Sequence, residues 1–406
     1  MKFTVVIPTA DRSNTLRHTI KTCVDQDYAD YEILVSDNCS QDETRDVVDN
    51  FRDPRIRYIN TGKRLSMSSN WEFALNHVSE GYITYLGDDD GLLPQAVTDV
   101  AQIVAGSSTK AVSWLKADYC WPCNLNSNMQ NICIIPLQNR LYLYNSKRII
   151  NDITNLWLAY YRAPCVYNSF VDVEAMHRVR RQSGRFFASV TPDVYSGLVL
   201  LSQFDNYIYS TRPFSVNAAS GRSNGTAGRL SQEIAEQFFR EIDIPMHPKW
   251  PLIRGVVVSC VTESLMQIKE RGFFNDLRID LKRHLKYLIR EICTMEPALY
   301  EASIKQALNI AKMNSLEKQA QKYIAKYANK PINKATMLRV TEGRSMFLSI
   351  FADRLNCFDV YAASKIISSI LGPYEQPAEL SSYFHHSKIM ARLYILFGRY
   401  VSDRTL

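Results

Sequence analysis

The sequence predicts an α/β fold with a mostly parallel sheet, followed by a helical region, and three observations predict it. Short apolar runs alternate with helical segments over about the first 230 residues, as in the crossover units of a parallel sheet. One of these runs ends abruptly in three carboxylates. From about Leu230 onward the pattern is helical, without detectable repeats. We therefore expect one domain at residues 1–229 and a helical domain at residues 230–406.

The individual elements follow from the spacing of apolar residues. Strands are expected at the short apolar runs, residues 3–8, 31–36, 56–60, 81–86 and 111–116. Helices are expected where apolar residues recur at helical spacing between them, residues 14–23, 42–51, 69–78 and 94–105. Residues 118–145 have little periodicity and predict an excursion from the sheet, such as a hairpin. Thr191 and Pro192 open a further helix, and residues 207–209 predict another strand.

Composition limits the class of protein. The chain has 406 residues, of which 46% are hydrophobic, and no apolar run approaches the length that crosses a bilayer. Because a strand begins at Phe3, no signal peptide is expected. The nine cysteines form no framework, so reduced thiols in a cytoplasmic protein are expected. Cys120, Cys123 and Cys133 lack a second Cys pair and a nearby His, and we interpret them as ordinary thiols.

Charge is distributed unevenly along the chain. Residues 246–406 carry a net charge of +10, whereas the preceding residues carry −3. This favours an anionic partner, such as a membrane surface, a lipid phosphate or nucleic acid, or equally the solvated face of a helical bundle. At residues 385–400 an apolar stripe has cationic flanks. It suits an interfacial helix or, slightly better, packing against the helical region or a second subunit.

The acidic run Asp88-Asp89-Asp90 is the most informative motif. Clustered carboxylates raise one another's pKa and destabilise a fold unless a cation neutralises them. This run ends a strand, and open α/β sheets bind ligands at the carboxyl ends of their strands. A divalent cation carrying a phosphate would neutralise it there. A solvated acidic turn is the alternative, but the position on the fourth strand favours a ligand site.

Three motifs, taken in order, resemble the family 2 glycosyltransferases of the GT-A fold. Residues 5–9 resemble the first strand of that family, residues 35–42 its second strand end, and residues 86–90 its metal-binding acidic motif. The resemblance covers about the first 230 residues and implies a Rossmann-like, nucleotide-sugar-binding domain. Ser36 stands where many members have an acid, and Gly87 where a common form of the acidic motif starts.

The resemblance implies a donor site at the carboxyl ends of the strands. Asp37 would bind the base or ribose, while Asp90, with Asp88, would hold Mn²⁺ or Mg²⁺ and offset the charge of the leaving diphosphate. It stays open whether Asp88 or Asp89 assists the metal. The candidate donor-binding residues are Pro8, Thr9, Asp11, Arg12, Asp37, Lys63, Asn70, Asp88, Asp89 and Arg222. Structural alternatives are helix capping by Asp37 or Asn70, surface solvation of Lys63, and a plain linker around Arg222.

The resemblance also implies a catalytic base. An acceptor hydroxyl must lose a proton during sugar transfer. Asp193 begins a helix about 100 residues after the acidic motif, where inverting members of this family usually carry the base. Its alternative role is a favourable charge at a helix amino terminus.

The sequence therefore predicts an inverting, metal-dependent glycosyltransferase that moves a sugar from a nucleotide sugar, first of all a UDP-sugar, to a glycan or lipid-linked acceptor. The family commonly acts in surface polysaccharide or lipopolysaccharide assembly. An anionic membrane surface on the cytoplasmic side and a homo-oligomer formed through the helical domain are further expected partners, and nucleic acid is not. The alternatives are a nucleotide-sugar-binding scaffold and a haloacid-dehalogenase-type phosphatase. The phosphatase motif usually lies on the first strand and continues with Thr, whereas Leu92 stands here.

Overall fold

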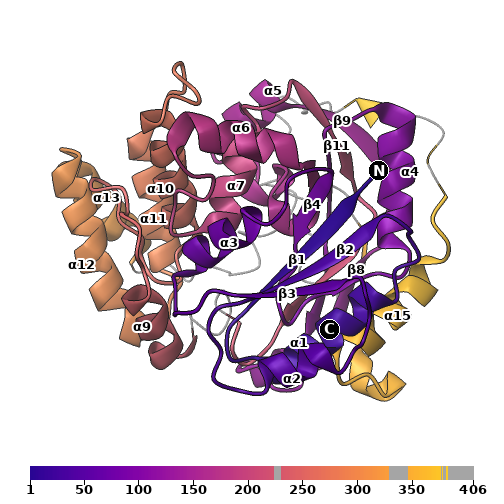
Figure 1. Cartoon of the computed structure of the whole chain (residues 1–406). Coiled ribbons are helices and arrows are strands. Elements are labelled where there is room, and N and C mark those ends of the chain that lie inside the picture. The colour runs from indigo at the N-terminus through magenta and orange to yellow at the C-terminus, as the bar shows by residue number, and fades with distance from the viewer. Residues whose placement is uncertain (224–229, 329–345, 376, 378–380, 383–406) are drawn as a thin grey trace.

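A nine-stranded sheet lies at the centre of the molecule, in the order β14-β9-β11-β6-β10-β4-β1-β2-β3 (Figure 1). The computed structural model describes residues 1–223, 230–328, 346–375, 377 and 381–382. The strands are β1 (Phe3–Thr9), β2 (Tyr31–Asp37), β3 (Ile56–Asn60), β4 (Tyr82–Tyr85), β6 (Ala111–Trp114), β9 (Leu141–Asn145), β10 (Ser169–Asp172), β11 (Asn206–Ser210) and β14 (Ser381–Ser382). Strands β1 to β4 pair in parallel, whereas β10 runs antiparallel to both of its neighbours. The predicted α/β class is confirmed.

Helices cover both faces of this sheet because its strands are apolar on both sides. Val5 and Ile7 of β1 face one core, and Val6 faces the other, as expected from the alternation of side chains along a strand. The helices on the first face are α1 (Ser13–Val24), α2 (Thr44–Asp49) and α4 (Ala96–Ser107). The helices on the second face are α3 (Met67–Leu75), α5 (Ser146–Thr154), α6 (Val173–Ser183) and α7 (Pro192–Leu200).

A second sheet of five strands, in the order β13-β8-β7-β12-β5, holds the excursion from the main sheet. Its strands are β5 (Gly91–Leu92), β7 (Ala117–Cys120), β8 (Ile132–Pro136), β12 (Ser215–Ala219) and β13 (Phe347–Phe351). Strands β7 and β8 pair antiparallel, which confirms the predicted hairpin. Strand β12 pairs with β5 directly after the acidic run, and this pairing brings the chain after Ala219 next to the carboxylates.

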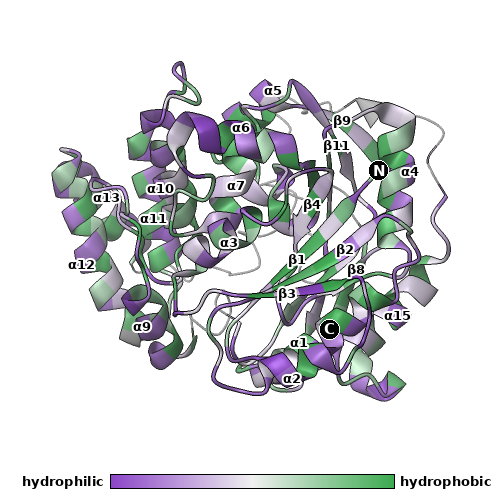
Figure 2. Ribbon diagram, viewed as in Figure 1, coloured by the Kyte–Doolittle hydropathy of each residue, from purple (hydrophilic) through white to green (hydrophobic). Residues whose placement is uncertain are grey.

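The helical region begins where the sequence predicts it. It contains α9 (Gln232–Arg240), α10 (Val257–Glu270), α11 (Leu281–Ile292), α12 (Pro297–Met313) and α13 (Glu317–Tyr327). Figure 2 shows both hydrophobic and hydrophilic residues along these helices. Apolar residues of α10 to α13 share a core around Trp250 and Leu288, whereas Phe238 of α9 packs in a separate cluster. The buried Glu263 of α10 accepts a hydrogen bond from Ser189 Oγ at 2.5 Å. Helix α10 is thereby tied to the loop that precedes α7.

The chain after residue 346 returns to the second sheet, which corrects the expectation of helices throughout residues 230–406. Strand β13 pairs antiparallel with β8, and helix α15 (Val360–Leu371) packs against α1. Lys365 and Tyr361 both bind Asp25, at 2.7 and 2.8 Å. Residues 347–351 alternate between exposed and half-buried positions, the pattern of an edge strand. The domain boundary near residue 230 stays a prediction.

In the described part of the chain, no helix combines the length and the apolarity needed to span a membrane. The amphipathic segment predicted at residues 385–400 lies outside the described residues.

Candidate active site

The loops that follow the strands of the main sheet converge on a cavity of about 1110 Å³. Thr9 and Asp37 end β1 and β2 as register partners, and the acidic run follows β4 in the same direction. Thr9, Asp88, Asp89 and Asp193 all line the cavity. The structure thus brings together the acidic motif and the predicted base, which are separated by about 100 residues in the sequence.

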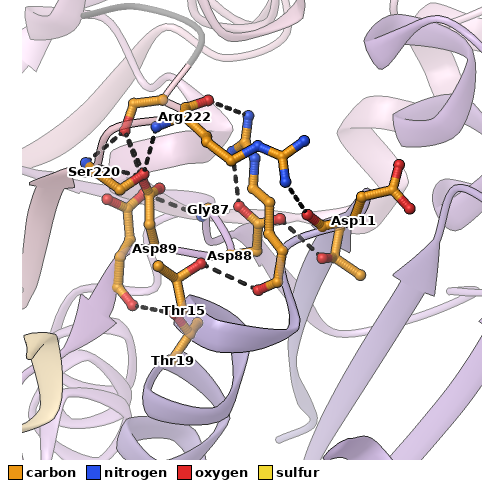
Figure 3. Close-up of polar contacts among 12 residues, drawn as sticks. Asp11, Thr15, Thr19, Gly87, Asp88, Asp89, Ser220 and Arg222 are labelled. Atoms are coloured by element: carbon orange, nitrogen blue, oxygen red, sulfur yellow. Dashed lines mark hydrogen bonds and ion pairs between the residues drawn. The ribbon is translucent and has the colours of Figure 1, made fainter. Parts of the chain in front are cut away.

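Asp88 is held in place by the loop after β1. Its carboxylate accepts hydrogen bonds from Thr9 Oγ1 at 2.8 Å and from Arg12 Nη1 at 2.9 Å (Figure 3). Burial raises the pKa of Asp88, and the positive charge of Arg12 opposes that rise. Both carboxylate oxygens therefore have partners within the protein, so this residue also fixes Arg12 at the wall of the cavity.

Asp89 binds the segment that follows β12. One carboxylate oxygen, Oδ2, accepts hydrogen bonds from Ser220 N at 3.2 Å and from Ser220 Oγ at 2.6 Å, and also from Ser223 Oγ. The same segment is linked to the loop after β1, because Arg222 Nη1 donates to the carbonyl of Asp11 at 2.7 Å and Arg12 Nη2 donates to the carbonyl of Arg222 at 2.6 Å (Figure 3). Residues 220–223 thus close over the acidic run.

Asp90, the predicted metal ligand, is buried outside the cavity lining, and its role as a ligand stays a prediction. Its Oδ1 accepts a hydrogen bond from Ala218 N at 2.6 Å and its Oδ2 one from Gly87 N at 3.1 Å. The side chain is 1% exposed, and Asp90 is not among the residues that line the cavity. Burial, and then the nearby Asp89, raise its pKa to about 7. The third carboxylate therefore joins β12 to the acidic turn.

Gly87 makes this turn possible. A Cβ at this position would lie 2.5 Å from Asp90 Oδ2, which is closer than any real Cβ contact. Gly87 departs from the family pattern, and its local packing explains why. The missing side chain leaves room for the Asp90 carboxylate, which accepts a hydrogen bond from Gly87 N.

Among the other predicted donor residues, Pro8, Asn70 and Arg222 line the cavity. Asn70 Oδ1 accepts a hydrogen bond from Ser36 Oγ at 2.7 Å, which joins α3 to the end of β2. Ser36 thus donates a hydrogen bond at the position where many family members have an acidic residue. Arg222 is exposed at the rim, and residues 224–229, which follow it closely, lie outside the described residues.

Three predicted donor residues do not line the cavity: Asp11, Asp37 and Lys63. Asp37 is 2% exposed and accepts hydrogen bonds from Tyr58 Oη at 2.5 Å and Asn60 Nδ2 at 3.0 Å. Asp11 forms an ion pair with Arg64. Lys63 is exposed to solvent. The next residue after Asp37, Asn38, reaches the lining instead.

Asp193 is the second residue of α7, directly after Pro192 at the first helical position. It lines the cavity. Burial raises the pKa of Asp193, whereas a hydrogen bond from the backbone of Val194 and the positive charge of Lys116 lower it. A half-buried carboxylate with a raised pKa at the wall of a cavity is suited to accept a proton.

The sequence analysis missed a cluster of Lys116, Tyr167 and Asn217 in the same lining. Lys116 Nζ donates to Asn217 Oδ1 at 3.1 Å and lies 4.3 Å from the centre of the Tyr167 ring. Tyr167 Oη donates to the same oxygen at 3.2 Å. The sequence did contain a signal for Lys116. It is a cation at the end of a predicted strand, residues 111–116, and the other ligand-binding residues were predicted at such strand ends.

The fold and this cleft are those of a GT-A-like domain, and a comparison with known families agrees. The family model described as Glycosyl transferase family 2 matches residues 4–154. Residues 4–154 thus match this family, which confirms over these residues the resemblance that the sequence motifs carried.

Two curated relatives are glucosyltransferases. The GalNAc(5)-diNAcBac-PP-undecaprenol beta-1,3-glucosyltransferase of Campylobacter jejuni is 38% identical over 104 residues, which are 25% of this chain and 34% of that protein. The UDP-Glc:alpha-D-GlcNAc-diphosphoundecaprenol beta-1,3-glucosyltransferase WfgD of Escherichia coli is 30% identical over 86 residues, 21% of this chain and 34% of that protein. The chain thus spans about a third of the length of each of these relatives.

Solved structures with a similar course of the chain include S. aureus TarS 1–349 in complex with UDP-GlcNAc. That similarity has a TM-score of 0.46 and 12% identity, and it covers 80% of this chain and 91% of the TarS chain. The mannosyltransferase PcManGT of Pyrobaculum calidifontis in complex with GDP-Man and Mn²⁺ has a TM-score of 0.38 and 13% identity, over 98% of this chain and 88% of that chain.

Proposed function

We propose that this protein is an inverting, metal-dependent glycosyltransferase that moves a sugar from a UDP-sugar to a lipid-linked glycan acceptor. The observation that carries the proposal is the shared cavity, in which Asp193 faces the same space as Asp88 and Asp89. The family match favours a transferase over the phosphatase and the scaffold considered from the sequence. The names of the two curated relatives, which include UDP-Glc and undecaprenol-linked acceptors, support the donor and acceptor classes.

A divalent metal ion fits the acidic run at Asp89. The hydrogen bonds found for its carboxylate all go to Oδ2, so Oδ1 is the oxygen available to a cation in the described structure. Mg²⁺ and Mn²⁺ are commonly bound by one or two carboxylates together with substrate phosphates. Within the described ranges, no three His, Cys, Asp or Glu side chains are arranged to hold a metal ion by themselves. We therefore propose Asp89, in place of Asp90, as its main ligand. When bound, this ion would neutralise the charge of the departing diphosphate.

The side chains of the cavity suggest how transfer proceeds. Arg12 and Lys116 place two cations in the wall near the acidic run, where they can bind the donor diphosphate by charge-assisted hydrogen bonds. Asp193 would take the proton from the acceptor hydroxyl. The hydroxyl oxygen then bonds to the anomeric carbon as the bond from that carbon to the diphosphate breaks. Attack opposite the leaving group inverts the anomeric configuration.

The proposal is tested with a panel of nucleotide sugars. Purified protein with Mn²⁺ should bind UDP and release it slowly from one UDP-sugar through hydrolysis, and chelation of the metal should stop the release. Nuclear magnetic resonance of the transfer product should show an anomeric configuration opposite to that of the donor. Absence of binding to every nucleotide sugar in the presence of Mn²⁺ would contradict a transferase.

Replacement of Lys116 should change the pH dependence of transfer. A base works only when deprotonated, so kcat/KM falls as the pH drops through the pKa of Asp193. Burial raises that pKa and Lys116 lowers it. In Lys116→Met the acid limb of the kcat/KM profile should therefore move to higher pH, and the KM for the donor should rise because a diphosphate contact is lost. Profiles of initial rate against pH, with saturating acceptor, measure both effects.

Lys116→Arg is the matched control, since it keeps the charge and should keep the acid limb near its original pH. Tyr160, Tyr167 and Cys165 also lie near the Asp193 charge and remain unchanged in both variants. An acid limb that does not move in Lys116→Met would mean that Asp193 does not limit the rate, or that Lys116 does not influence it.

A further inference from the structure

A carboxylate is buried between α10 and the loop that precedes α7. Glu263 of α10 is 0% exposed. It accepts hydrogen bonds from three donors, Ser189 Oγ at 2.5 Å, His247 N at 3.0 Å and Gln267 Nε2 at 2.8 Å. Among the described residues, no lysine or arginine forms an ion pair with it. Burying a carboxylate costs free energy unless it is paired and hydrogen-bonded, so packing alone does not account for this residue.

The loop before α7 connects this carboxylate to the cavity. Ser189 Oγ, which donates to Glu263, accepts a hydrogen bond from Thr191 N at 3.3 Å and lies 3.4 Å from Thr191 Oγ1. Thr191 lines the cavity two residues before Asp193. It occupies the N-cap position of α7, but its side chain makes no capping hydrogen bond and lies 3.4 Å from Ser264 Oγ of α10. The start of α7 is therefore held by α10 and not by the side chain of its own cap.

Helix α3 also holds this loop. Ser68 Oγ donates to the carbonyl of Ser189 at 2.7 Å, and Glu72 Oε2 accepts from two successive backbone N–H groups of the loop, at 2.9 and 2.8 Å. Ser68 lines the cavity, and α3 lies within the family 2 match at residues 4–154, whereas α10 does not. The loop before α7 is thus fixed both by the part of the chain that the family describes and by the helical region.

We propose that Glu263 is a positioning residue, which holds the proposed base Asp193 in place by binding Ser189. The inference rests on the proposed function and adds to it a residue of the helical region. Asp193 is the second residue of α7, so a shift at the start of this helix moves its carboxylate relative to the acceptor hydroxyl. Misplacement of a reacting group by about 1 Å can lower a rate about 10²-fold. The proposed diphosphate contacts lie on the loops after β1, β4 and β6, so donor affinity should not depend on Glu263.

The first measurement is hydrolysis of UDP-glucose with Mn²⁺, in which water takes the place of the acceptor hydroxyl. Glu263→Gln keeps the size of the side chain, but its NH₂ group cannot accept a hydrogen bond from Ser189 Oγ. We expect a kcat that is about tenfold lower, with a KM for UDP-glucose within about twofold of the original value. Ser189→Ala should have the same effect. The double variant should be no slower than Ser189→Ala, because both substitutions remove one and the same contact.

The second measurement needs no substrate. Hydrogen exchange in peptides that cover residues 186–196 should be about tenfold faster in Glu263→Gln, because the loop opens more often without this contact. Thr262→Val is the matched control, since Thr262 is also 0% exposed and its hydroxyl contacts His284 Nδ1 of α11 at 2.7 Å. Its hydroxyl binds neither the loop before α7 nor the cavity. Thr262→Val should leave both kcat and the exchange of residues 186–196 unchanged.

The possible outcomes separate this inference from the proposed function. An unchanged kcat in Glu263→Gln, or an equal loss in Thr262→Val, would overturn the inference. If Glu263→Gln does not fold, Ser189→Ala, which keeps the carboxylate, is measured in its place. If the original protein does not hydrolyse UDP-glucose, this donor is rejected, and the exchange rates still decide whether Glu263 holds the loop. A slow Glu263→Gln beside an Asp193→Asn variant with the original rate would instead reject Asp193 as the base.

Discussion

Asp193→Asn should lower the rate of sugar transfer by about 10²–10⁴-fold, the usual contribution of a general base. The substitution keeps the shape of the side chain at the start of α7 but removes its ability to take a proton. Donor binding should stay within about threefold, because the proposed diphosphate contacts lie at Arg12, Lys116 and Asp89. Single-turnover transfer rates and calorimetric titration with the UDP-sugar measure the two quantities separately.

A matched control for this substitution is Asp205→Asn, at an exposed aspartate beyond the carboxyl end of α7. It should leave both quantities unchanged, since it removes a charge outside the cavity lining. A large loss of donor affinity in Asp193→Asn, with the transfer rate of bound substrate retained, would place Asp193 in the donor site and leave the reaction without the proposed base.

Asp89→Asn and Asp90→Asn should fail in different ways, although the residues are adjacent. Asp89→Asn should lower transfer by about 10³-fold, because metal stabilisation of a leaving diphosphate contributes several kcal/mol, and it should raise the Mn²⁺ concentration needed for activity. Asp90→Asn should lower the free energy of unfolding by about 1–3 kcal/mol. Its amide can accept from Ala218 N with one atom only, and its NH₂ group would face the N–H of Gly87.

Urea denaturation and the Mn²⁺ dependence of transfer distinguish these outcomes in the same pair of variants. If Asp90→Asn is as stable as the original protein and has lost its response to Mn²⁺, the metal ligand is Asp90, as the sequence motif suggested. The orientation of the acidic run would then have to change when the donor binds.

The order and type of the elements up to about residue 116 could be predicted because their signals are local, whereas α5, β10 and α6 were not predicted. The strand beginning at Phe3 and the strand beginning at Tyr31 are continuous apolar runs, and the polar residues that follow them mark the ends of the strands. The acidic run and Asp193 could be brought to one cleft only through the family resemblance, since nothing in the spacing of residues shows that α7 reaches the end of β4.

The parts that could not be predicted depend on contacts between distant residues. The orientation of Asp90 is set by Ala218, which is 128 positions away in the sequence. Similarly, Asp37 resembles a nucleotide-binding acid, but Tyr58 and Asn60 on the neighbouring β3 bind its carboxylate. Helix α4 begins at Ala96 and not at the predicted Pro94, because Gln95 adopts a left-handed conformation with φ of 63°. Such features emerge only when the elements are packed.

The pairing of β13 with β8 also means that the second sheet is completed late during translation. Ile132 pairs with Phe351, so the second sheet lacks its last strand until the ribosome has made the whole helical region. Until then β8 presents an open edge, which is prone to pair with another chain. The helical region is thus an insertion between two strands of one sheet. A fragment that ends near residue 230 would keep the acidic run but expose this edge, and it should aggregate where the longer chain does not.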